Sequence, residues 1–546
     1  MDEWWRGSVT YQVYPRSFQD DSGDGIGDLK GITRRLPHIA ELGADAVWLS
    51  PVFTSPMADM GYDVSDYTDI DPLFGTLQDF DEMVAAAHGL ALKVIIDQVL
   101  SHSSSAHPFF QDSRRSREGE HADWYVWADP RPDGSPPNNW LSVFGGPAWE
   151  WEPRRRQYYL HNFLPSQPDF NFHVSEVRQW LLSTMEFWLE RGVDGFRLDT
   201  VNFYTHDIQL RSNPPQARNE VLPAVNPYEM QRHIHDKNRP ENVGFLEEMR
   251  ALTDRYQGRA LVGEVGESGA RAVEIMAEYT GGQNRLHMAY SFELLSPEYS
   301  AGHFRRAVEG FYRAAPDGMP CWSFSNHDVT RHVSRWSAHG TQDALARQAA
   351  ALLLALQGSV CLYQGEELGQ TETEIEFHEL TDPPGKTFWP DYKGRDGCRT
   401  PMVWDASAHG GFTSGAPWLP VKPPQAARHV AGQVAVPGSV LEFYRAMLAF
   451  RRGHPALRSG GTTFLDLPEP LLGFVRGEGE GRILCLFNLS GAEAEIVLSG
   501  TGAALGPMQA AMPGPGRIGF GATGFAFLAA GEAVSATLPA ATGGGG

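Results

Sequence analysis

The chain is poor in cysteine and lacks the elements that direct a protein to a membrane. Its few cysteines are widely spaced and form no CxxC pair: Cys321, Cys361, Cys398 and Cys485. This spacing argues against a zinc site or a disulfide framework, so we expect free thiols in a reducing compartment. The first residues contain no basic segment followed by an apolar one. The apolar run 349–356 is too short to span a bilayer. We therefore expect a cytoplasmic protein without a membrane partner.

Positive charge is also scarce. Lysine and arginine number 45 against 67 acidic residues, which gives a formal net charge of −22. Nucleic acid is an unfavourable ligand for such a chain, because phosphate binding needs a basic surface. Hydrophobic residues make up 42% of the chain and aromatic residues 11%, which excludes a disordered protein. These properties favour a neutral, polar small molecule as the substrate.

Short β-branched runs alternate with helical segments for most of the length. Strands alternating with helices predict a parallel sheet, and eight such units predict a closed (β/α)8 barrel. The strands are nearly all apolar, as expected when both faces are buried. The predicted strands are 9–14, 46–50, 91–98, 195–199, 260–264, 285–292, 321–325 and 359–363.

Two segments interrupt this alternation, and the character of the chain changes near its end. Residues 103–173 are rich in Pro, Trp, Asp and Asn and predict an inserted subdomain. Residues 203–242 form a second long insertion. Residues 464–546 contain short alternating strands separated by glycine-rich turns, which predicts an antiparallel β-sandwich. The barrel would then comprise residues 1–102 and 174–463.

Acidic residues and histidines gather at the carboxyl ends of the predicted strands, where barrel enzymes carry their chemistry. A lone acid there can instead cap a helix or pair with an arginine. Several acids on different strands, together with histidines, favour an active site. These residues are Asp97, His102, Asp199, Glu264, His327 and Asp328.

The surroundings of two of these acids suggest different protonation states. Arg197 and Asp199 lie two apart on a predicted strand, so their side chains share a face. The guanidinium would depress the pKa of Asp199 and keep it ionised, as a nucleophile requires. Glu264 follows apolar Leu261 and Val262, where burial would raise its pKa and keep it protonated as a general acid. Two carboxyls with separated pKa values are typical of glycoside chemistry.

Four short motifs, taken together, resemble the α-amylase superfamily of retaining glycoside hydrolases and transglycosylases (family 13). They are DQVLSH (97–102), GFRLD (195–199), LVGE (261–264) and SNHD (325–328). Each occurs in the family's order and on the expected strand. The resemblance covers nearly the whole chain and is strongest to the oligo-1,6-glucosidase and maltase branch.

The resemblance implies a role for each position. Asp199 matches the nucleophile, Glu264 the general acid/base, and Asp328 the third carboxylate, which holds the sugar hydroxyls. Asp97 would support the site structurally. The remaining matched side chains would hold the glucose: Arg197, His102, His327 and Arg399.

The segment Asp59-Met-Gly-Tyr62 resembles the family's D-x-G-Y, whose Asp and Tyr close the blind end of a pocket. A closed pocket implies release of a terminal glucose. Tyr62 could stack on a sugar face, and a core aromatic is the alternative. Thr200 follows the nucleophile, where the branch's α-1,6 enzymes carry valine, so the resemblance favours α-1,4 bonds such as that of maltose.

The resemblance therefore implies a retaining, exo-acting α-glucosidase that acts on short oligosaccharides and also transfers glucose to sugar or alcohol acceptors. A sucrose- or trehalose-directed glucosyltransferase or isomerase is the alternative enzyme. A non-catalytic carbohydrate-binding relative is disfavoured, because all three carboxylates are present. No organic cofactor is expected.

The segment DDSGDGIGD (20–28) presents oxygens at alternate positions around a tight glycine turn, as an EF-hand-like loop does. The oxygens would come from Asp20, Ser22, Asp24, the Ile26 carbonyl and Asp28. These donors suit Ca2+ or Mg2+, and the resemblance also implies a structural cation here. An ordinary acidic turn is the alternative.

Overall fold

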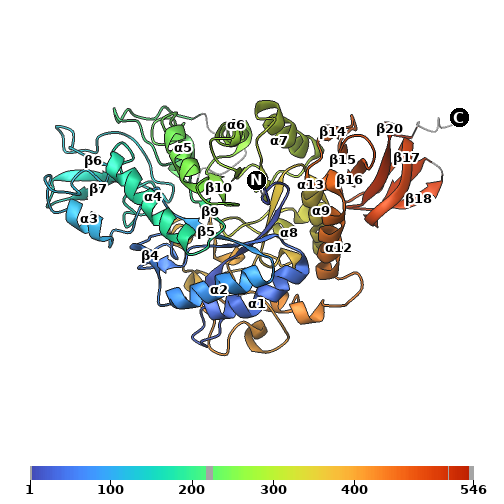
Figure 1. Ribbon diagram of the computed structural model, residues 1–546, viewed down its shortest axis with the longest axis horizontal. Coiled ribbons are helices and arrows are strands. Elements are labelled where there is room, and N and C mark those ends of the chain that lie inside the picture. Colours follow the sequence, from blue (N-terminus) through green and yellow to red (C-terminus); the bar gives the residue numbers. More distant parts are fainter. Residues whose placement is uncertain (1–2, 217–224, 515, 540–546) are drawn as a thin grey trace.

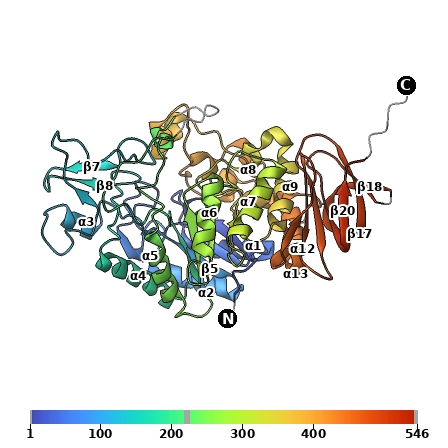
Figure 2. The same cartoon turned by 90° about the horizontal axis from the view of Figure 1, so that it is seen from above.

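A computed structural model of the chain describes residues 3–216, 225–514 and 516–539. In these residues eight parallel strands form one sheet in the order β11-β10-β9-β5-β2-β1-β13-β12. A parallel bridge between Ala289 and Pro320 joins its two edges, so the sheet closes into the predicted (β/α)8 barrel. The barrel occupies the centre of the molecule (Figures 1 and 2). Its strands are β1 (Val9–Val13), β2 (Ala46–Leu49), β5 (Lys93–Gln98), β9 (Gly195–Leu198), β10 (Ala260–Val265), β11 (Met288–Ser291), β12 (Cys321–Trp322) and β13 (Ser359–Tyr363).

Helices cover the outside of the barrel and bury apolar side chains against it. The helix α1 shows how local sequence sets such an element. Its N-cap residue Asp28 accepts a hydrogen bond from the Gly31 N–H, and Gly43 ends it at a φ of 104°. The covering helices are α1 (Leu29–Leu42), α2 (Leu77–Gly89), α4 (Ser175–Glu190), α5 (Asn242–Thr253), α6 (Gly269–Thr280), α7 (Ala301–Ala314), α9 (Gln342–Ala355) and α12 (Val440–Gly453).

The segment between β5 and α4 projects from one end of the molecule (Figure 1). It contains α3 (Pro108–Ser113) and an antiparallel sheet in the order β6-β8-β7, formed by β6 (Trp127–Ala128), β7 (Trp149–Glu152) and β8 (Gln157–Leu160). Its core is aromatic: the rings of Trp140 and Trp149 stack with centroids 5.8 Å apart. The segment therefore has its own small core beside the barrel mouth.

The insertion 203–242 lies against this subdomain. Asn139 donates to the Asn213 carbonyl at 2.9 Å, and Asn226 donates to the Val143 carbonyl at 2.7 Å. Within the insertion, η2 (Pro227–Met230) is a short 3-10 helix. Residues 217–224 lie outside the described part of the chain. The two long insertions, which follow β5 and β9, are thus in contact with each other.

The C-terminal region packs against α12 at the opposite end of the molecule (Figure 2). The rings of Phe450 in α12 and Phe527 in the sheet have centroids 5.1 Å apart. In the described residues, the segment 462–537 forms seven strands in one sheet, ordered β14-β15-β16-β20-β17-β19-β18. They are β14 (Thr462–Phe464), β15 (Leu471–Arg476), β16 (Ile483–Asn488), β17 (Ala494–Gln509), β18 (Ala511–Gly514), β19 (Arg517–Phe520) and β20 (Phe525–Thr537).

The predicted antiparallel β-domain is confirmed, and its seven strands form one continuous sheet. The long strands β17 and β20 run through both halves, and their pairing shifts register at several points between Ser499 and Gln509. Such irregularities bend strands. Leu486 from one half and Ile518 from the other belong to one apolar cluster. The sheet buries this second core by folding rather than by stacking on a separate sheet.

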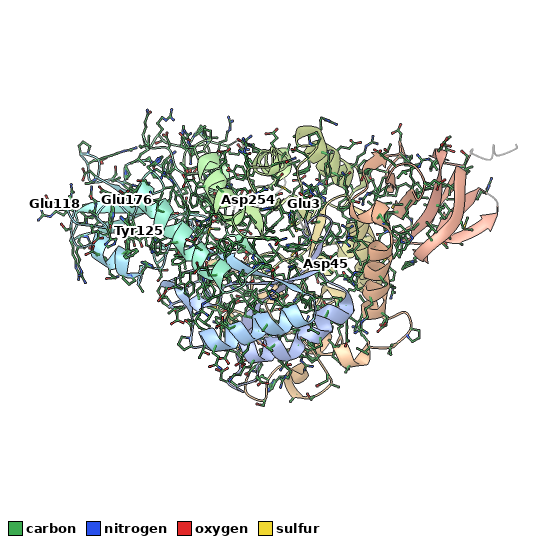
Figure 3. The ribbon with its side chains drawn as sticks, viewed as in Figure 1. Glu3, Asp45, Glu118, Tyr125, Glu176 and Asp254 are labelled. Carbon is green, nitrogen blue, oxygen red and sulfur yellow. The ribbon has the colours of Figure 1, made fainter. Side chains whose placement is uncertain are left out.

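Side chains fill the space between the barrel and its helices, while many acidic residues point outward (Figure 3). Glu118, Glu176 and Asp254 are exposed examples from separate parts of the surface. No helix in the described residues is long and apolar enough to cross a membrane.

Candidate active site

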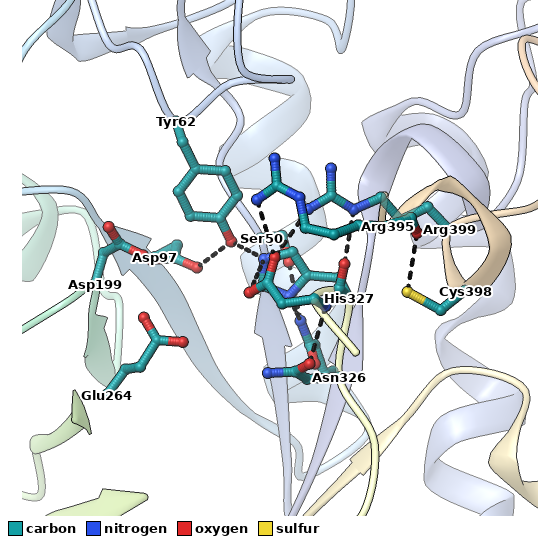
Figure 4. A network of polar contacts seen from close by, with 12 residues as sticks. Ser50, Tyr62, Asp97, Asp199, Glu264, Asn326, His327, Arg395, Cys398 and Arg399 are labelled. Carbon is teal, nitrogen blue, oxygen red and sulfur yellow. Dashed lines mark hydrogen bonds and ion pairs between the residues drawn. The ribbon is translucent and has the colours of Figure 1, made fainter. Parts of the chain in front are cut away.

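The carboxyl ends of β5, β9 and β10 bring three buried carboxylates around one guanidinium. Arg197 donates to both oxygens of Asp97, at 2.8 and 3.0 Å, and to Asp199 Oδ1 at 2.6 Å. Its second terminal nitrogen lies 2.5 Å from Glu264 Oε1. Figure 4 shows Asp199 and Glu264 on the same side of the site as Asp97, whose carboxylate faces the Tyr62 hydroxyl. The convergence of these side chains follows from parallel strands ending at the same edge.

The close placement of these three acids around one arginine determines how they are protonated. Burial raises the pKa of each of Asp97, Asp199 and Glu264 to about 7, and Arg197 opposes the rise. The predicted rise in the pKa of Glu264 is confirmed. For Asp199 the prediction of a depressed pKa was wrong, because Arg197 is shared with two further carboxylates and cannot offset the burial of all three. The group therefore titrates as a unit and retains protons near neutral pH.

Glu264 is held from two sides. The Tyr290 hydroxyl donates to Oε1 at 2.9 Å, and the Thr200 N–H donates to Oε2 at 3.1 Å. Thr200 has a φ of 41°, a left-handed conformation that is rare for a β-branched residue. That conformation turns the peptide N–H after Asp199 toward Glu264. Sequence reasoning missed Tyr290, whose position at the end of β11 was the available signal.

Asp328 follows β12 and has the opposite electrostatic surroundings. His327 Nε2 lies 3.3 Å from Oδ2, while Arg399 and Arg395 donate to Oδ1 at 2.9 and 3.2 Å. Burial alone would raise its pKa, but His327 and the two arginines outweigh it and hold the pKa well below its usual range. Asp328 is therefore ionised over the working pH range and suits a hydrogen-bond acceptor for sugar hydroxyls.

Arg395 connects this acid to the segment predicted to close the pocket. Its guanidinium donates to Asp59 Oδ1 at 2.7 Å and to Asp382 Oδ1 at 2.7 Å. Gln167 donates to the other oxygen of Asp59 at 3.1 Å. Sequence reasoning missed Arg395, Asp382 and Gln167. The signal for Arg395 was its place four residues before Arg399, because a short 3-10 turn over Asp396–Cys398 brings both arginines to one side.

Tyr62, His102 and His327 also converge here. The Tyr62 ring stacks on His327 with centroids 5.3 Å apart, and its hydroxyl contacts Asp97 Oδ2 at 3.2 Å and His327 Nε2. One face of the Tyr62 ring is therefore occupied by protein. His102 donates from Nε2 to the Tyr62 carbonyl at 3.0 Å, and burial lowers its pKa to about 4. His102 is thus a neutral donor at working pH.

In the loop 20–28, the carboxylates of Asp20 and Asp28 accept hydrogen bonds from groups of the loop itself. Asp20 accepts from the N–H groups of Gly23 and Gly25 at 2.7 and 2.8 Å, and from the hydroxyls of Ser22 and Thr413. Asp28 accepts from the Ser22 N–H at 3.0 Å and caps α1.

The donors are hard oxygens, which fit Ca2+ or Mg2+ in chemistry. The described residues contain no group of three or more His, Cys, Asp or Glu side chains placed to hold a metal. The cation at 20–28 therefore stays a prediction.

The barrel and its carboxylate-lined mouth define a glycoside hydrolase. A family model, "Alpha amylase, catalytic domain", matches residues 12–460. The chain belongs to this family.

Relatives and solved structures agree with this assignment. A probable alpha-glucosidase of Rhizobium meliloti (strain 1021) is 58% identical over 89% of this chain and 90% of the relative. An oligo-1,6-glucosidase of Heyndrickxia coagulans is 36% identical over 90% of this chain and 93% of the relative. A crystal structure of an alpha-glucosyl transfer enzyme superposes with a TM-score of 0.93 at 52% identity, covering 97% of this chain and all of that one. The trehalulose synthase of Pseudomonas mesoacidophila MX-45 gives a TM-score of 0.86 at 30% identity, over 96% of this chain and 99% of that one.

Proposed function

We propose that the protein is a retaining, exo-acting α-glucosidase that releases α-glucose from the non-reducing end of short α-1,4-glucosides such as maltose. The observation that carries this proposal is the bridging of Asp199 and Glu264 by Arg197, at 2.6 and 2.5 Å. Retaining enzymes need their two carboxyls about 5–5.5 Å apart, whereas inverting enzymes leave room for a water between them. A shared guanidinium favours the close arrangement.

In the first step Glu264 gives its proton to the glycosidic oxygen while Asp199 attacks C1. The bond from C1 to that oxygen breaks, the aglycone leaves as an alcohol, and a β-glucosyl ester forms on Asp199. Glu264 is then a carboxylate and takes a proton from water. The water oxygen attacks C1, the ester bond breaks, and α-glucose is released.

The protonation states of the group support these roles. Because the pKa values of Asp199 and Glu264 both lie at about 7, the pair retains a proton near neutral pH. The mechanism needs one carboxyl ionised and the other protonated. The Thr200 N–H and the Tyr290 hydroxyl hold Glu264 in place for this transfer.

The ion pair of Asp59 with Arg395 supports exo-action. It lies beside Asp328, and Asp59 is buried against Gln167. These charged groups would bind the hydroxyls of a terminal glucose and leave no path for a continuing chain. We propose the same role for Arg399, which holds Asp328.

Transfer of glucose to a sugar or an alcohol is part of the proposal, because any hydroxyl can replace water in the second step. The structural similarity to an alpha-glucosyl transfer enzyme and to a trehalulose synthase favours this second outcome. With sucrose as the donor, the same intermediate would give isomeric disaccharides.

The test is proton NMR of the anomeric signals of maltose incubated with the protein, with Asp199→Ala as the control. Early release of α-glucose by the wild type and none by the variant is the expected result. New α-glucoside signals at high maltose would demonstrate transfer. Early release of β-glucose would overturn retention, and no reaction with maltose, isomaltose, sucrose or trehalose would overturn the activity.

Linkage preference has its own test. Replacing Thr200 by Val removes the hydroxyl that contacts Ser101 Oγ at 3.0 Å and Asp199 Oδ2 at 3.3 Å. We expect kcat/KM for maltose relative to isomaltose to fall about tenfold, the usual effect of one altered contact on discrimination. A constant ratio would remove Thr200 from the specificity determinants.

A further inference from the structure

A buried lysine from the second insertion is bonded to the loop that follows the general acid. Lys237 is 3% exposed. Its ammonium donates to the Gly266 carbonyl at 2.9 Å and pairs with Glu267 Oε1 at 2.8 Å. Gly266 and Glu267 are the second and third residues after Glu264. A buried ammonium is costly unless it is paired, so this position has a specific set of partners.

The N–H of Gly266 is also bonded, to the loop that follows Asp199. Asn202 accepts from the Gly266 N–H at 2.8 Å and donates to Asn238 Oδ1 at 2.7 Å. Asn238 in turn donates to Glu267 Oε1 at 2.7 Å. Both backbone polar groups of Gly266 are therefore bonded, its N–H to the loop after Asp199 and its carbonyl to Lys237 in the insertion. The network joins the loops after Asp199 and Glu264 to the insertion.

Close packing adds to these bonds. A Cβ at Gly266 would lie 2.9 Å from Cε2 of Phe203, so the backbone rests directly on that ring. The Lys237 ammonium lies 4.7 Å from the centre of the same ring, within cation–π range. The Phe203 ring packs against Phe163 with centroids 5.5 Å apart. Loss of the lysine would leave the Gly266 carbonyl and the Glu267 carboxylate without their charged partner and would remove the cation above this ring.

We propose that Lys237 is a positioning residue for Glu264 on the leaving-group side of the site. It acts through Gly266 and keeps the end of β10 in the orientation from which Glu264 donates its proton. The proposal rests on the proposed function, in which Glu264 is the general acid. Proton transfer requires hydrogen-bond geometry, and a displacement of about 1 Å can reduce the rate about 100-fold.

The test compares leaving groups. Maltose releases a sugar alcohol that needs a proton, while 4-nitrophenyl α-glucoside releases a phenolate that departs without one. We expect Lys237→Met to lower kcat/KM for maltose at least about tenfold and to leave the value for the nitrophenyl substrate within about threefold. Lys237→Arg, which keeps the charge and the donors, should recover most of the activity on maltose.

Two further variants complete the design. Lys93→Met removes an ion-paired lysine at the opposite end of the barrel and should leave the ratio of the two substrates unchanged. If Lys237→Met does not fold, Glu267→Gln replaces it, because it removes the charge of the partner but keeps the shape of the side chain. It should lower kcat/KM for maltose relative to the nitrophenyl substrate, by less than Lys237→Met. Equal losses on both substrates in the Lys237 and Glu267 variants, or no loss on either, would overturn the proposal. A wild type inactive on both substrates would instead refute the proposed function.

Discussion

The two ends of the barrel hold buried carboxylates in opposite surroundings. At the amino end, Asp194 precedes β9 and is contacted by several basic side chains. His88 Nε2 lies 2.6 Å from one oxygen, and Arg259 and Lys93 lie 2.7 and 3.2 Å from the other. At this end, basic groups outnumber the acid that they surround.

At the carboxyl end, acidic groups outnumber the basic group that they surround. Asp199 lies there, five residues after Asp194. There the Arg197 guanidinium is shared among Asp97, Asp199 and Glu264. Burial raises the pKa of all three acids to about 7. The amino end is thus arranged for stability, while the carboxyl end keeps an excess of acids that stability alone does not require. In the proposed mechanism, that excess supplies the nucleophile and the acid at neutral pH.

The largest expected effect comes from removing the nucleophile. Asp199→Asn should lower kcat on maltose by at least about 10^4-fold. It should also raise the stability of the fold by about 1 kcal/mol. The sign follows from the raised pKa of Asp199, because ionising such a group weakens the fold as the pH rises toward 7. Steady-state kinetics and a thermal melt at pH 7 check both effects. A variant that is less stable than wild type would contradict this reading of the carboxyl end.

The matched change at the amino end should have the opposite result. Asp194→Asn should lower the stability by about 3 kcal/mol, the lower end of the range for breaking a buried ion pair, because Lys93 and His88 are partly exposed. Its kcat/KM on maltose should equal that of the wild type below the melting transition. A large loss of activity in the folded variant would show that the two ends are coupled.

The acids of the loop 20–28 have surroundings different from those at either end of the barrel. Here backbone N–H groups surround Asp20 and, despite its burial, hydrogen bonds from Thr413, Gly23 and Gly25 lower its pKa. If the predicted cation binds, Ca2+ at 100 times its dissociation constant should stabilise the protein by about 2.7 kcal/mol. Thermal melts with EDTA and with added Ca2+ measure this. Equal melting temperatures with EDTA and with Ca2+ would show that the loop is an ordinary acidic turn that binds no Ca2+.

The smallest effect concerns the pH dependence of the acid group. Asp97→Asn removes one negative charge beside Asp199 and Glu264, which makes ionisation of both easier and lowers their pKa values. Both limbs of the kcat/KM profile should shift to lower pH, by about one unit. Asp194→Asn serves as the control, and its profile should coincide with that of the wild type. A shift to higher pH would contradict the charge argument.

Much of the fold could be predicted from local patterns. Apolar runs of strand length alternate with amphipathic segments, and this alternation predicts the barrel strands and most of the helices that cover them. The antiparallel β-domain at the C-terminus could also be predicted, but its strand order and bends could not, because they depend on contacts between segments distant in the chain. Short-range alternation cannot distinguish one folded sheet from two.

The active-site acids illustrate the same division. The convergence of Asp199, Glu264 and Asp328 could be predicted because each follows a strand of the barrel within a short motif. Arg395 could not be assigned, because its partner Asp59 lies more than 300 residues away in sequence. The sign of the Asp199 pKa shift was missed for a related reason: adjacency to Arg197 was visible, but the sharing of Arg197 with Asp97 and Glu264 was not.

The sequence by itself determined the element order, the barrel and the acids that stand at the strand ends, because these depend on residue type and spacing along one segment. Only the tertiary structure decided which charges share a partner, how the acids titrate, and that Lys237 is bonded to the loop behind Glu264. Burial and electrostatic interaction depend on distance in space, and the closed barrel sets those distances by bringing the ends of separate strands to one face.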